Sequence, residues 1–317
     1  GRPGATAWPK PCAACSTWTS RATAALLRAA TRASPLARWQ TDHVAVLLGR
    51  PVETVVVDTV GDRRQDAPIW EIGGRGVFVK EVQAAVLDGR ADFAVHSAKD
   101  LPSTATPGLV IVAVPERADA RDALVGATLD RLPPGGLVAT GSVRRRAQLA
   151  AVRPDLTFVG LRGNVDTRLG QAGRYTAIVM AAAALARLQR TPPVVDLLPT
   201  AVLLPQVGQG ALAVECREDD DAMLAALSGV DHAPSHRALL AERAFLGQLG
   251  SGCELPVGAL AAAGATGPVR LEGLLASLDG RIVLRAGAED DDPEVAGRSL
   301  AAHLLEDCGG AWLLAGR

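Results

Sequence analysis

The sequence predicts an α/β protein of three domains: two α/β lobes and a small α+β domain at the C-terminal end. Three observations predict this. Strand-like and helix-like segments alternate up to residue 117, and the alternation restarts after a polar connector at residues 117–121. Beyond residue 232 the pattern changes to one long helix followed by strands. A chain of 317 residues is long enough for three domains of ordinary size.

In the first lobe, short β-branched and apolar runs predict strands at residues 53–58, 91–95 and 109–114. An amphipathic pattern predicts a helix at residues 78–87. A further apolar run at residues 212–216 follows the second lobe and could cross back to the first. The expected domain boundaries are therefore 25–117 plus 208–231 for the first lobe, 118–207 for the second and 232–317 for the third. Residues 1–24 are expected to form a disordered extension.

The second lobe repeats the alternation. Its predicted strands are residues 137–140, 156–159 and 175–180, and its predicted helices are residues 143–152, 165–171 and an Ala-rich run ending at 188. Alternation of this kind favours mostly parallel sheets, whose ligands bind near the carboxyl ends of the strands. We expect a ligand between the two lobes.

The third domain should begin with a helix at residues 235–249. Strand-like runs follow at residues 256–262, 270–275 and 282–286, and a helix at residues 294–305. The acidic run at residues 289–292 is expected to be a solvated loop.

Composition excludes several classes of protein. The net charge of -1 argues against a nucleic-acid-coating protein, so an anionic ligand would need a local cluster of cations. Five scattered cysteines do not form a disulfide framework, and the Cys12/Cys15 pair has no second pair at zinc-ligand spacing, so no metal is expected. No run is long and apolar enough to span a bilayer. The first forty residues lack Asp and Glu, which leaves a plastid transit peptide as the alternative to a cytoplasmic protein.

Residues 96–102 (HSAKDLP) follow a predicted strand of the first lobe directly. Lys99 and Asp100 would lie at the carboxyl end of that strand, where α/β proteins bind ligands. Pro102 disfavours helix at the residue before it, which favours an irregular loop that presents side chains. A surface Lys–Asp pair without function is the alternative.

Two strand-to-helix junctions of the second lobe carry arginines. Residues 140–146 (TGSVRRR) offer hydroxyl groups, helix-start N–H groups and the guanidinium groups of Arg144 and Arg145. Residues 161–168 (LRGNVDTR) repeat this arrangement, with Asn164 as the expected N-cap and Arg168 one turn into the helix. Because no glycine-rich nucleotide loop accompanies them, carboxylates are the favoured ligands. A capped helix with a solvated basic face remains the alternative.

Cys253 stands in a glycine-flanked segment, residues 250–256 (GSGCELP), just after a predicted helix. An accessible cysteine with small neighbours suits a covalent attachment point or a nucleophile. A buried structural cysteine in a turn is the alternative.

These segments, taken in order, resemble the hydroxymethylbilane synthase (porphobilinogen deaminase) family. The matching segments are residues 30–37 (ATRASPLA), 73–81 (GGRGVFVKE), 96–102, 140–149 (TGSVRRRAQL), 161–169 (LRGNVDTRL), 207–211 (VGQGA) and 252–258 (GCELPVG). The resemblance runs from about residue 28 to the C-terminal end and depends on many motifs in the family's order.

The resemblance implies two periplasmic-binding-protein-like lobes, a third domain carrying a dipyrromethane bound through a thioether to Cys253, and a catalytic aspartate at Asp100. It implies that porphobilinogen is the substrate and that four units are joined into hydroxymethylbilane, with ammonia released. Transient hand-over to uroporphyrinogen-III synthase and a monomeric state are expected by analogy; neither nucleic acid nor membrane is expected as a partner. The positions that match cofactor- and substrate-binding residues are Arg32, Ser34, Lys99, Thr140, Ser142, Arg144, Arg145, Arg162, Arg168 and Arg187, with Gln40, Phe78 and Gln209 in supporting positions.

The chain departs from the family pattern at three positions. Val60 replaces a basic residue at the start of a loop expected to cover the cleft, and Glu71 stands where some relatives have lysine; Arg63, Arg64 and Arg75 could compensate. Gly141 replaces a common serine, which removes a hydroxyl group and keeps the backbone N–H. A non-catalytic two-lobed protein that binds organic anions and a paralogue without activity are the rival interpretations.

Overall fold

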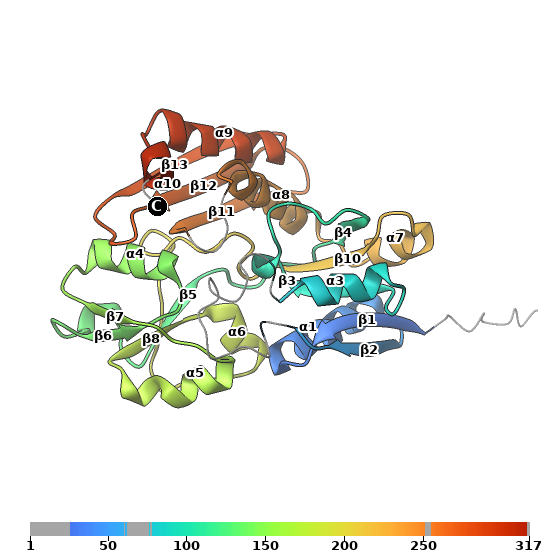
Figure 1. Ribbon diagram of the computed structural model, residues 1–317, viewed down its shortest axis with the longest axis horizontal. Helices are drawn as coiled ribbons and strands as arrows, with labels where there is room; N and C mark the ends of the chain where they lie inside the picture. Colours follow the sequence, from blue (N-terminus) through green and yellow to red (C-terminus); the bar gives the residue numbers. More distant parts are fainter. Residues whose placement is uncertain (1–25, 60, 62–75, 77, 251–254, 316–317) are drawn as a thin grey trace, which may run out of the picture.

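The computed structural model describes residues 26–59, 61, 76, 78–250 and 255–315. They form three units, each built on its own β-sheet (Figure 1). The third unit lies against both of the others and against the chain segments that connect them. We call the first two units lobe 1 and lobe 2, and the last one the C-terminal unit.

Lobe 1 holds a five-stranded sheet in the order β2-β1-β3-β10-β4. The strands are β1 (Leu27–Arg32), β2 (Val52–Val57), β3 (Phe93–Ser97), β4 (Leu109–Ala113) and β10 (Leu212–Arg217). The helices are α1 (Pro35–Leu48), α3 (Lys80–Leu87) and α7 (Asp221–Ser228), with a 3-10 turn, η2 (Ala98–Asp100), directly after β3. The prediction that residues 212–216 cross back to the first lobe is confirmed, because β10 lies between β3 and β4.

Lobe 2 holds a second five-stranded sheet in the order β7-β6-β8-β5-β9. The strands are β5 (Asp122–Val125), β6 (Leu137–Ala139), β7 (Thr157–Val159), β8 (Ala177–Ala181) and β9 (Val195–Leu197). The helices are α4 (Val143–Val152), α5 (Val165–Gln171) and α6 (Ala182–Arg187), with 3-10 turns η3 (Leu129–Arg131) and η4 (Ala172–Arg174). The predicted bounds of α4 and α5 are confirmed to the residue.

The expectation of mostly parallel sheets is confirmed in strand direction, because four of the five strands in the sheet of each lobe run the same way and one runs opposite. In lobe 1, β1 runs parallel to β2 and β3, but β10 runs antiparallel to both of its neighbours. Lobe 2 repeats this pattern with β5 antiparallel to β8 and β9. Strands β5 and β10 are each the first strand after the chain crosses between the lobes. Each runs opposite to the other strands of its sheet.

The C-terminal unit is an antiparallel three-stranded sheet covered by helices. Its strands are β11 (Val257–Ala263), β12 (Val269–Ala276) and β13 (Val283–Asp290), and its helices are α8 (Ala233–Gln248), α9 (Pro293–Glu306) and α10 (Ala311–Ala315). Helices α8 and α9 pack on one another and on this sheet around the buried Phe245 and Leu300. The acidic run is only partly a loop, because Glu289 and Asp290 pair with β12 as the end of β13, while Asp292 caps α9.

Local sequence explains where the helices begin. The side chains of Ser34, Ser142 and Asn164 cap α1, α4 and α5 by accepting a hydrogen bond from the backbone N–H three residues on. In α1 the fixed φ of Pro35 also favours the first helical position, and Gly49 ends the helix with a φ of 62°. The predicted N-cap at Asn164 is confirmed.

Two chain segments connect the lobes, residues 114–121 and 198–211, and Glu242 of α8 binds both. The fully buried carboxylate of Glu242 accepts hydrogen bonds from Arg117 in the first connector (2.5 Å) and from the Gly208 N–H in the second (2.7 Å). It also accepts the Ala261 N–H of β11 (2.8 Å). One acidic side chain of the C-terminal unit therefore fixes both connectors.

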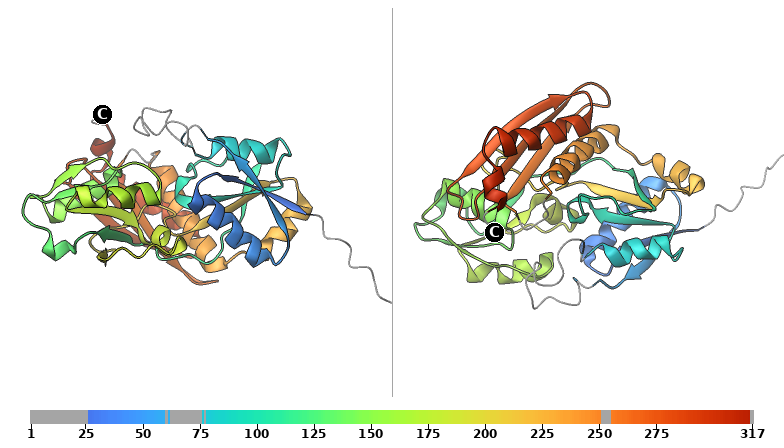
Figure 2. Two further views of the ribbon diagram at one scale, coloured as in Figure 1. Left: turned by 90° about the horizontal axis from the view of Figure 1, so that it is seen from below. Right: turned by 45° about the horizontal axis from the view of Figure 1, so that its top comes forward.

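The C-terminal unit also contacts lobe 2. The turn between β12 and β13 lies against α4, where a Cβ added at Gly280 would come within 2.2 Å of the Ala147 carbonyl oxygen. Arg285 donates to the carbonyl oxygens of Thr200 and Ala201 in the second connector. These contacts explain why Figure 2 shows this unit seated across lobe 2 and the connectors.

Candidate active site between the lobes

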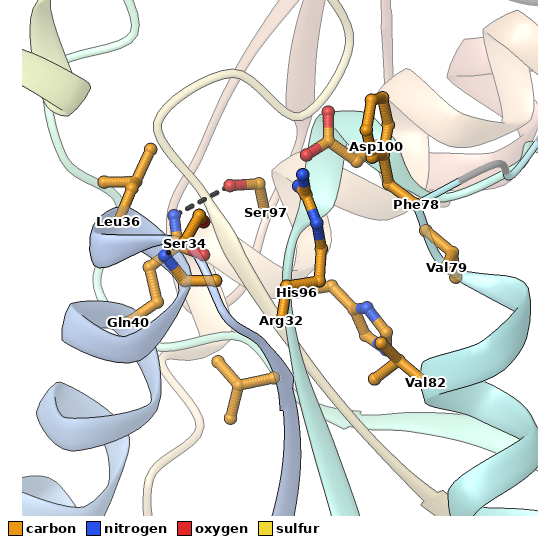
Figure 3. A pocket seen from close by; sticks show the side chains of 12 residues that line it. Arg32, Ser34, Leu36, Gln40, Phe78, Val79, Val82, His96, Ser97 and Asp100 are labelled. Atoms are coloured by element: carbon orange, nitrogen blue, oxygen red, sulfur yellow. Dashed lines mark hydrogen bonds between the residues drawn. The ribbon is translucent and has the colours of Figure 1, made fainter. Parts of the chain in front are cut away.

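A pocket opens in lobe 1 at the carboxyl ends of two parallel strands (Figure 3). Arg32 is the last residue of β1, and Asp100 closes the turn that follows β3. Ser34, Gln40, Phe78 and His96 also line the pocket. Figure 3 shows the side chains of Arg32 and Asp100 directed toward one another. The predicted strand end indicated Asp100, whereas Arg32, Ser34, Gln40 and Phe78 were expected only from the family resemblance.

The supporting side chains of this pocket hold one another in place. The guanidinium carbon of Arg32 lies 4.2 Å from the centroid of the Phe78 ring, a cation–π contact. The amide of Gln40 donates to the Ser97 hydroxyl at 2.7 Å and is buried. Ser34 acts on the backbone, as the cap of α1. The pocket thus has a prearranged wall of one cation, one carboxylate and one aromatic ring.

In lobe 2, the arginine pair after β6 has an internal partner that the sequence did not indicate. Arg144 lies 2.9 Å from one oxygen of Asp122, and Arg145 lies 2.7 Å from the other. The Gln209 amide also donates to Asp122, at 2.9 Å. Burial alone would raise the pKa of Asp122, but the two guanidinium charges outweigh it and hold the pKa below its ordinary value. Asp122 is therefore a fully buried carboxylate beneath both arginines.

Other donors of the two arginines are directed at backbone carbonyl oxygens. Arg144 donates to the Leu204 carbonyl oxygen (2.6 Å) and Arg145 to the Val179 carbonyl oxygen (2.9 Å). The Thr140 hydroxyl accepts the Ser142 N–H at 3.2 Å. These hydrogen bonds fix the directions of both guanidinium groups without any ligand.

Gly141, which replaces a common serine, lies close to the neighbouring strand-to-helix junction. A Cβ at Gly141 would lie 2.8 Å from the Leu161 carbonyl oxygen, closer than real Cβ contacts. A serine here would require the backbone to shift, which is a physical reason for glycine in this chain.

Cations from both lobes converge near Asp100. Burial lowers the pKa of Lys99 to about 8; Asp100 partly opposes this shift, whereas the positive charges of Arg145 and Arg168 add to it. The pKa of Arg168 falls to about 10, again through burial first and then through Arg145, while Asp100 opposes the shift. The Lys99 ammonium makes no hydrogen bond or ion pair within the described residues. The nearby carboxylates therefore do not fully balance the positive charges around Lys99.

Arg162 adds to this excess of positive charge. Its Nη1 is buried and has no hydrogen-bond partner among the residues that the structure describes. Its charge also lowers the pKa of Arg168, so the two guanidinium groups are neighbours. A donor that is shielded from water and unpaired is costly, and an anionic ligand would satisfy it.

Arg187 and Gln209 lie at the junction between the lobes. Arg187 donates to the Gly210 carbonyl oxygen of the second connector (2.7 Å), and its guanidinium carbon lies 5.7 Å from the Trp39 ring centroid of lobe 1. Burial lowers the pKa of Arg187 to about 10. Gln209 donates to the Ala120 carbonyl oxygen of the first connector (2.7 Å) as well as to Asp122. Both side chains therefore link lobe 2 to the connectors.

Several predicted features lie outside the described residues. These are Cys253, the loop positions Val60, Arg63, Arg64, Glu71 and Arg75, the Cys12/Cys15 pair and the extension 1–24. Of the cysteines that the structure describes, Cys216 is buried, which raises the pKa of its thiol to about 11, and Cys308 is partly exposed. The described residues contain no cluster of three His, Cys, Asp or Glu side chains able to hold a metal ion. No described helix has the length and apolar character needed to cross a bilayer.

The sequence missed Asp122 because it also missed β5. Residues 117–121 are polar, and the strand that follows has only four residues, too short to show alternation. One signal was available. Asp122 stands directly before a run of apolar residues (DALV), and burying a carboxylate costs free energy unless a cation pairs with it. Arg144 and Arg145 follow the next strand and could supply that cation.

The fold and the site together define a two-lobed α/β protein in which cationic side chains of both lobes gather near the carboxylate of Asp100. The predicted fold class, with two α/β lobes and a small α+β unit, is confirmed. A family model described as porphobilinogen deaminase, dipyromethane cofactor binding domain, matches residues 27–225. A second, described as porphobilinogen deaminase, C-terminal domain, matches residues 236–306. The chain belongs to the porphobilinogen deaminase family.

Similar proteins extend over nearly the whole chain. Porphobilinogen deaminase of Roseiflexus castenholzii is 48% identical over 298 residues, covering 90% of this chain and 97% of the relative. The Acidothermus cellulolyticus protein of the same name is 46% identical over 302 residues, covering 90% and 91%. Among solved structures, an ABC transporter/periplasmic binding protein from Brucella ovis with glutathione bound has a TM-score of 0.40 at 12% identity, covering 68% of each chain.

Proposed function

We propose that this protein is a hydroxymethylbilane synthase, a transferase of tetrapyrrole biosynthesis. It would deaminate four porphobilinogen molecules in turn and join them head to tail on a covalent dipyrromethane, releasing hydroxymethylbilane and ammonia. The observation that carries the proposal is the proximity of Lys99 and Asp100 of lobe 1 to Arg145 and Arg168 of lobe 2. Family membership supports the same conclusion.

The residues at the cleft fit a dipyrromethane, which carries acetate and propionate groups. The cations around Lys99 outnumber the nearby carboxylates, Asp100 and Asp122, and the pKa values of Lys99 and Arg168 are lowered for that reason as well as by burial. Carboxylates of a ligand would relieve both effects through charge-assisted hydrogen bonds. The unpaired, buried Nη1 of Arg162 supports the same ligand chemistry.

We assign Cys253 as the attachment point of the group and Asp100 as the catalytic residue. The residues proposed to hold the cofactor and the substrate are Arg32, Ser34, Lys99, Thr140, Ser142, Arg144, Arg145, Arg162, Arg168 and Arg187, supported by Gln40, Phe78 and Gln209. When bound, the dipyrromethane supplies the electron-rich pyrrole carbon to which the first substrate unit is joined.

The chain's own residues perform three tasks in this scheme. The arginines bind substrate carboxylates and offset the repulsion between the acidic side chains that accumulate in one cleft. When the protonated amino group of porphobilinogen leaves as ammonia, positive charge develops on the substrate's pyrrole nitrogen. The fixed carboxylate of Asp100 stabilises that charge as it forms. The Phe78 ring restricts the Arg32 side chain on the same wall of the pocket.

The domain boundaries that accompany this proposal are 25–117 plus 208–231, 118–207 and 232–317. We further propose that the protein acts in the cytoplasm as a monomer and passes its product transiently to uroporphyrinogen-III synthase. Curated relatives from Roseiflexus and Acidothermus support the cytoplasm over a plastid.

Incubation with porphobilinogen tests the function directly. We expect consumption of porphobilinogen, release of one ammonia per unit consumed, and porphyrin absorbance after oxidation of the product. Intact-mass spectrometry of protein from a porphyrin-making host should show a dipyrromethane adduct, mapped by peptide analysis to Cys253. A bare polypeptide that binds porphobilinogen without releasing ammonia would instead indicate an anion-binding protein. A protein that carries the adduct but consumes no substrate would indicate an inactive paralogue.

A further inference from the structure

The proposed function releases one proton from carbon in each coupling cycle. Each time two pyrrole rings are joined, the ring that attacks must lose the hydrogen of its α-carbon before it becomes aromatic again. Asp100 already has a role, the stabilisation of positive charge on the incoming unit. A second proton acceptor near the pocket would leave the Asp100 carboxylate charged throughout the cycle.

His96 and Glu215 form a buried pair at this pocket. His96 lies on β3 and Glu215 on the adjacent antiparallel strand β10, with both side chains on the same face of the sheet. Nε2 of His96 lies 3.0 Å from Oε2 of Glu215, and the two side chains are 4% and 6% exposed. Nε2 of His96 has no other partner among the described residues, so Glu215 is the group that it faces. His96 lines the same pocket as Arg32 and Asp100, as Figure 3 shows.

Hydrogen bonds behind Glu215 fix its orientation. The Gln83 amide donates to Oε2 of Glu215 at 2.9 Å, and the Thr106 hydroxyl donates to the Gln83 amide oxygen at 3.0 Å. Burial would raise the pKa of Glu215, but the contacts with His96 and Gln83 and the charge of Arg243 hold it below its ordinary value. Glu215 is therefore a carboxylate that faces the imidazole.

The carboxylate determines which ring nitrogen carries the hydrogen. Nε2 must be the N–H group, because two lone pairs 3.0 Å apart would repel. In the neutral ring, Nδ1 then carries the free lone pair. Nδ1 has no hydrogen-bond partner within the described part of the chain, and its ring borders the pocket. A carboxylate that orients an imidazole whose other nitrogen is free is the arrangement of a general base.

We propose that His96, oriented by Glu215, is the catalytic base that removes the α-hydrogen in each coupling cycle; this rests on the proposed function. The α-C–H bond breaks, its electron pair returns to the pyrrole ring, and the proton moves to Nδ1. The imidazolium then gives the proton to the ammonia released in the same cycle, so that one ammonium ion leaves and the base is restored.

The test uses porphobilinogen deuterated at its free α-carbon and the holoprotein carrying its adduct. His96→Gln keeps an amide donor toward Glu215 and removes the basic nitrogen. We expect its turnover to fall about 10²-fold, the usual contribution of a general base. Its deuterium isotope effect should rise above that of the wild type, because C–H cleavage becomes slower than the other steps. Ammonia release from the first bound substrate should keep its wild-type rate.

His236→Gln, a partly exposed histidine of α8 that pairs with Asp231, is the matched control and should leave both the rate and the isotope effect unchanged. Unchanged turnover in His96→Gln, or slow turnover without a larger isotope effect, would overturn the proposal. If His96→Gln fails to fold or to carry the adduct, the Glu215→Gln variant tests the proposal in its place. It keeps the imidazole but not its orientation, so its isotope effect must also rise. If the wild-type protein consumes no porphobilinogen, the result would instead contradict the proposed function.

Discussion

Replacing Glu242 with glutamine should destabilise the protein by loosening both connectors at once. One oxygen of Glu242 accepts from Arg117 Nη1 and the Ala261 N–H, and the other from Arg117 Nη2 and the Gly208 N–H. Glutamine turns one of these oxygens into a donor, so two buried donors lose their acceptor. At about 1–3 kcal/mol for each unsatisfied group, the loss falls near the 3–5 kcal/mol typical of a broken buried ion pair.

A loss of this size corresponds to a decrease of about 5–8 °C in Tm for a chain of this length. Differential scanning calorimetry measures it, and hydrogen exchange at the Gly208 and Ala261 amides locates it. Glu294→Gln is the control, because its exposed i,i+4 pair with Arg298 should contribute less than about 0.5 kcal/mol. A Tm for Glu242→Gln within 1–2 °C of the control, roughly what the ordinary scatter of surface substitutions allows, would refute the idea that this carboxylate holds the connectors.

The remaining predictions concern the cleft. Asp100→Asn should retain the adduct on Cys253 but lose about 10²–10³-fold in turnover, measured as ammonia release, because the neutral amide cannot stabilise a developing cation; normal release would exclude the assigned role. Lys99 should lose its proton above pH of about 8, so KM for porphobilinogen should rise there, and Lys99→Arg should suppress the rise. Because its folded-state pKa lies below the ordinary 10.5, the free energy of unfolding should increase between about pH 8 and 10.5, a trend that chemical denaturation can follow. Arg145→Ala should lower the fraction of protein that carries the adduct by intact mass, and full loading with normal kinetics would favour a purely structural arginine.

The sequence predicted the site best where a strand ends in a polar motif. The turn holding Lys99 and Asp100 follows β3, and the caps of α4 and α5 are at Ser142 and Asn164, because strand ends and N-caps are determined locally. Helix α1 was not predicted, although Ser34-Pro35 is a good N-cap signal.

Partners far apart in the chain could not be predicted from the sequence. Glu215 meets His96 only because β10 returns between β3 and β4, and Asp122 meets Arg145 only across the sheet of lobe 2. A single sequence shows the residue types but not the strand order. For the same reason the antiparallel direction of β5 and β10 was missed.

The position of β10 also bears on how the molecule is assembled on the ribosome. Lobe 2 is built from one continuous stretch, whereas the sheet of lobe 1 lacks an inner strand until residues 212–217 have been synthesised. Until then β3 and β4 have no strand between them. The backbone N–H and C=O groups on their facing edges stay without hydrogen-bond partners until β10 is synthesised. Lobe 2 can therefore fold while lobe 1 is still open, and Glu215 reaches His96 only when the emerging chain closes that gap.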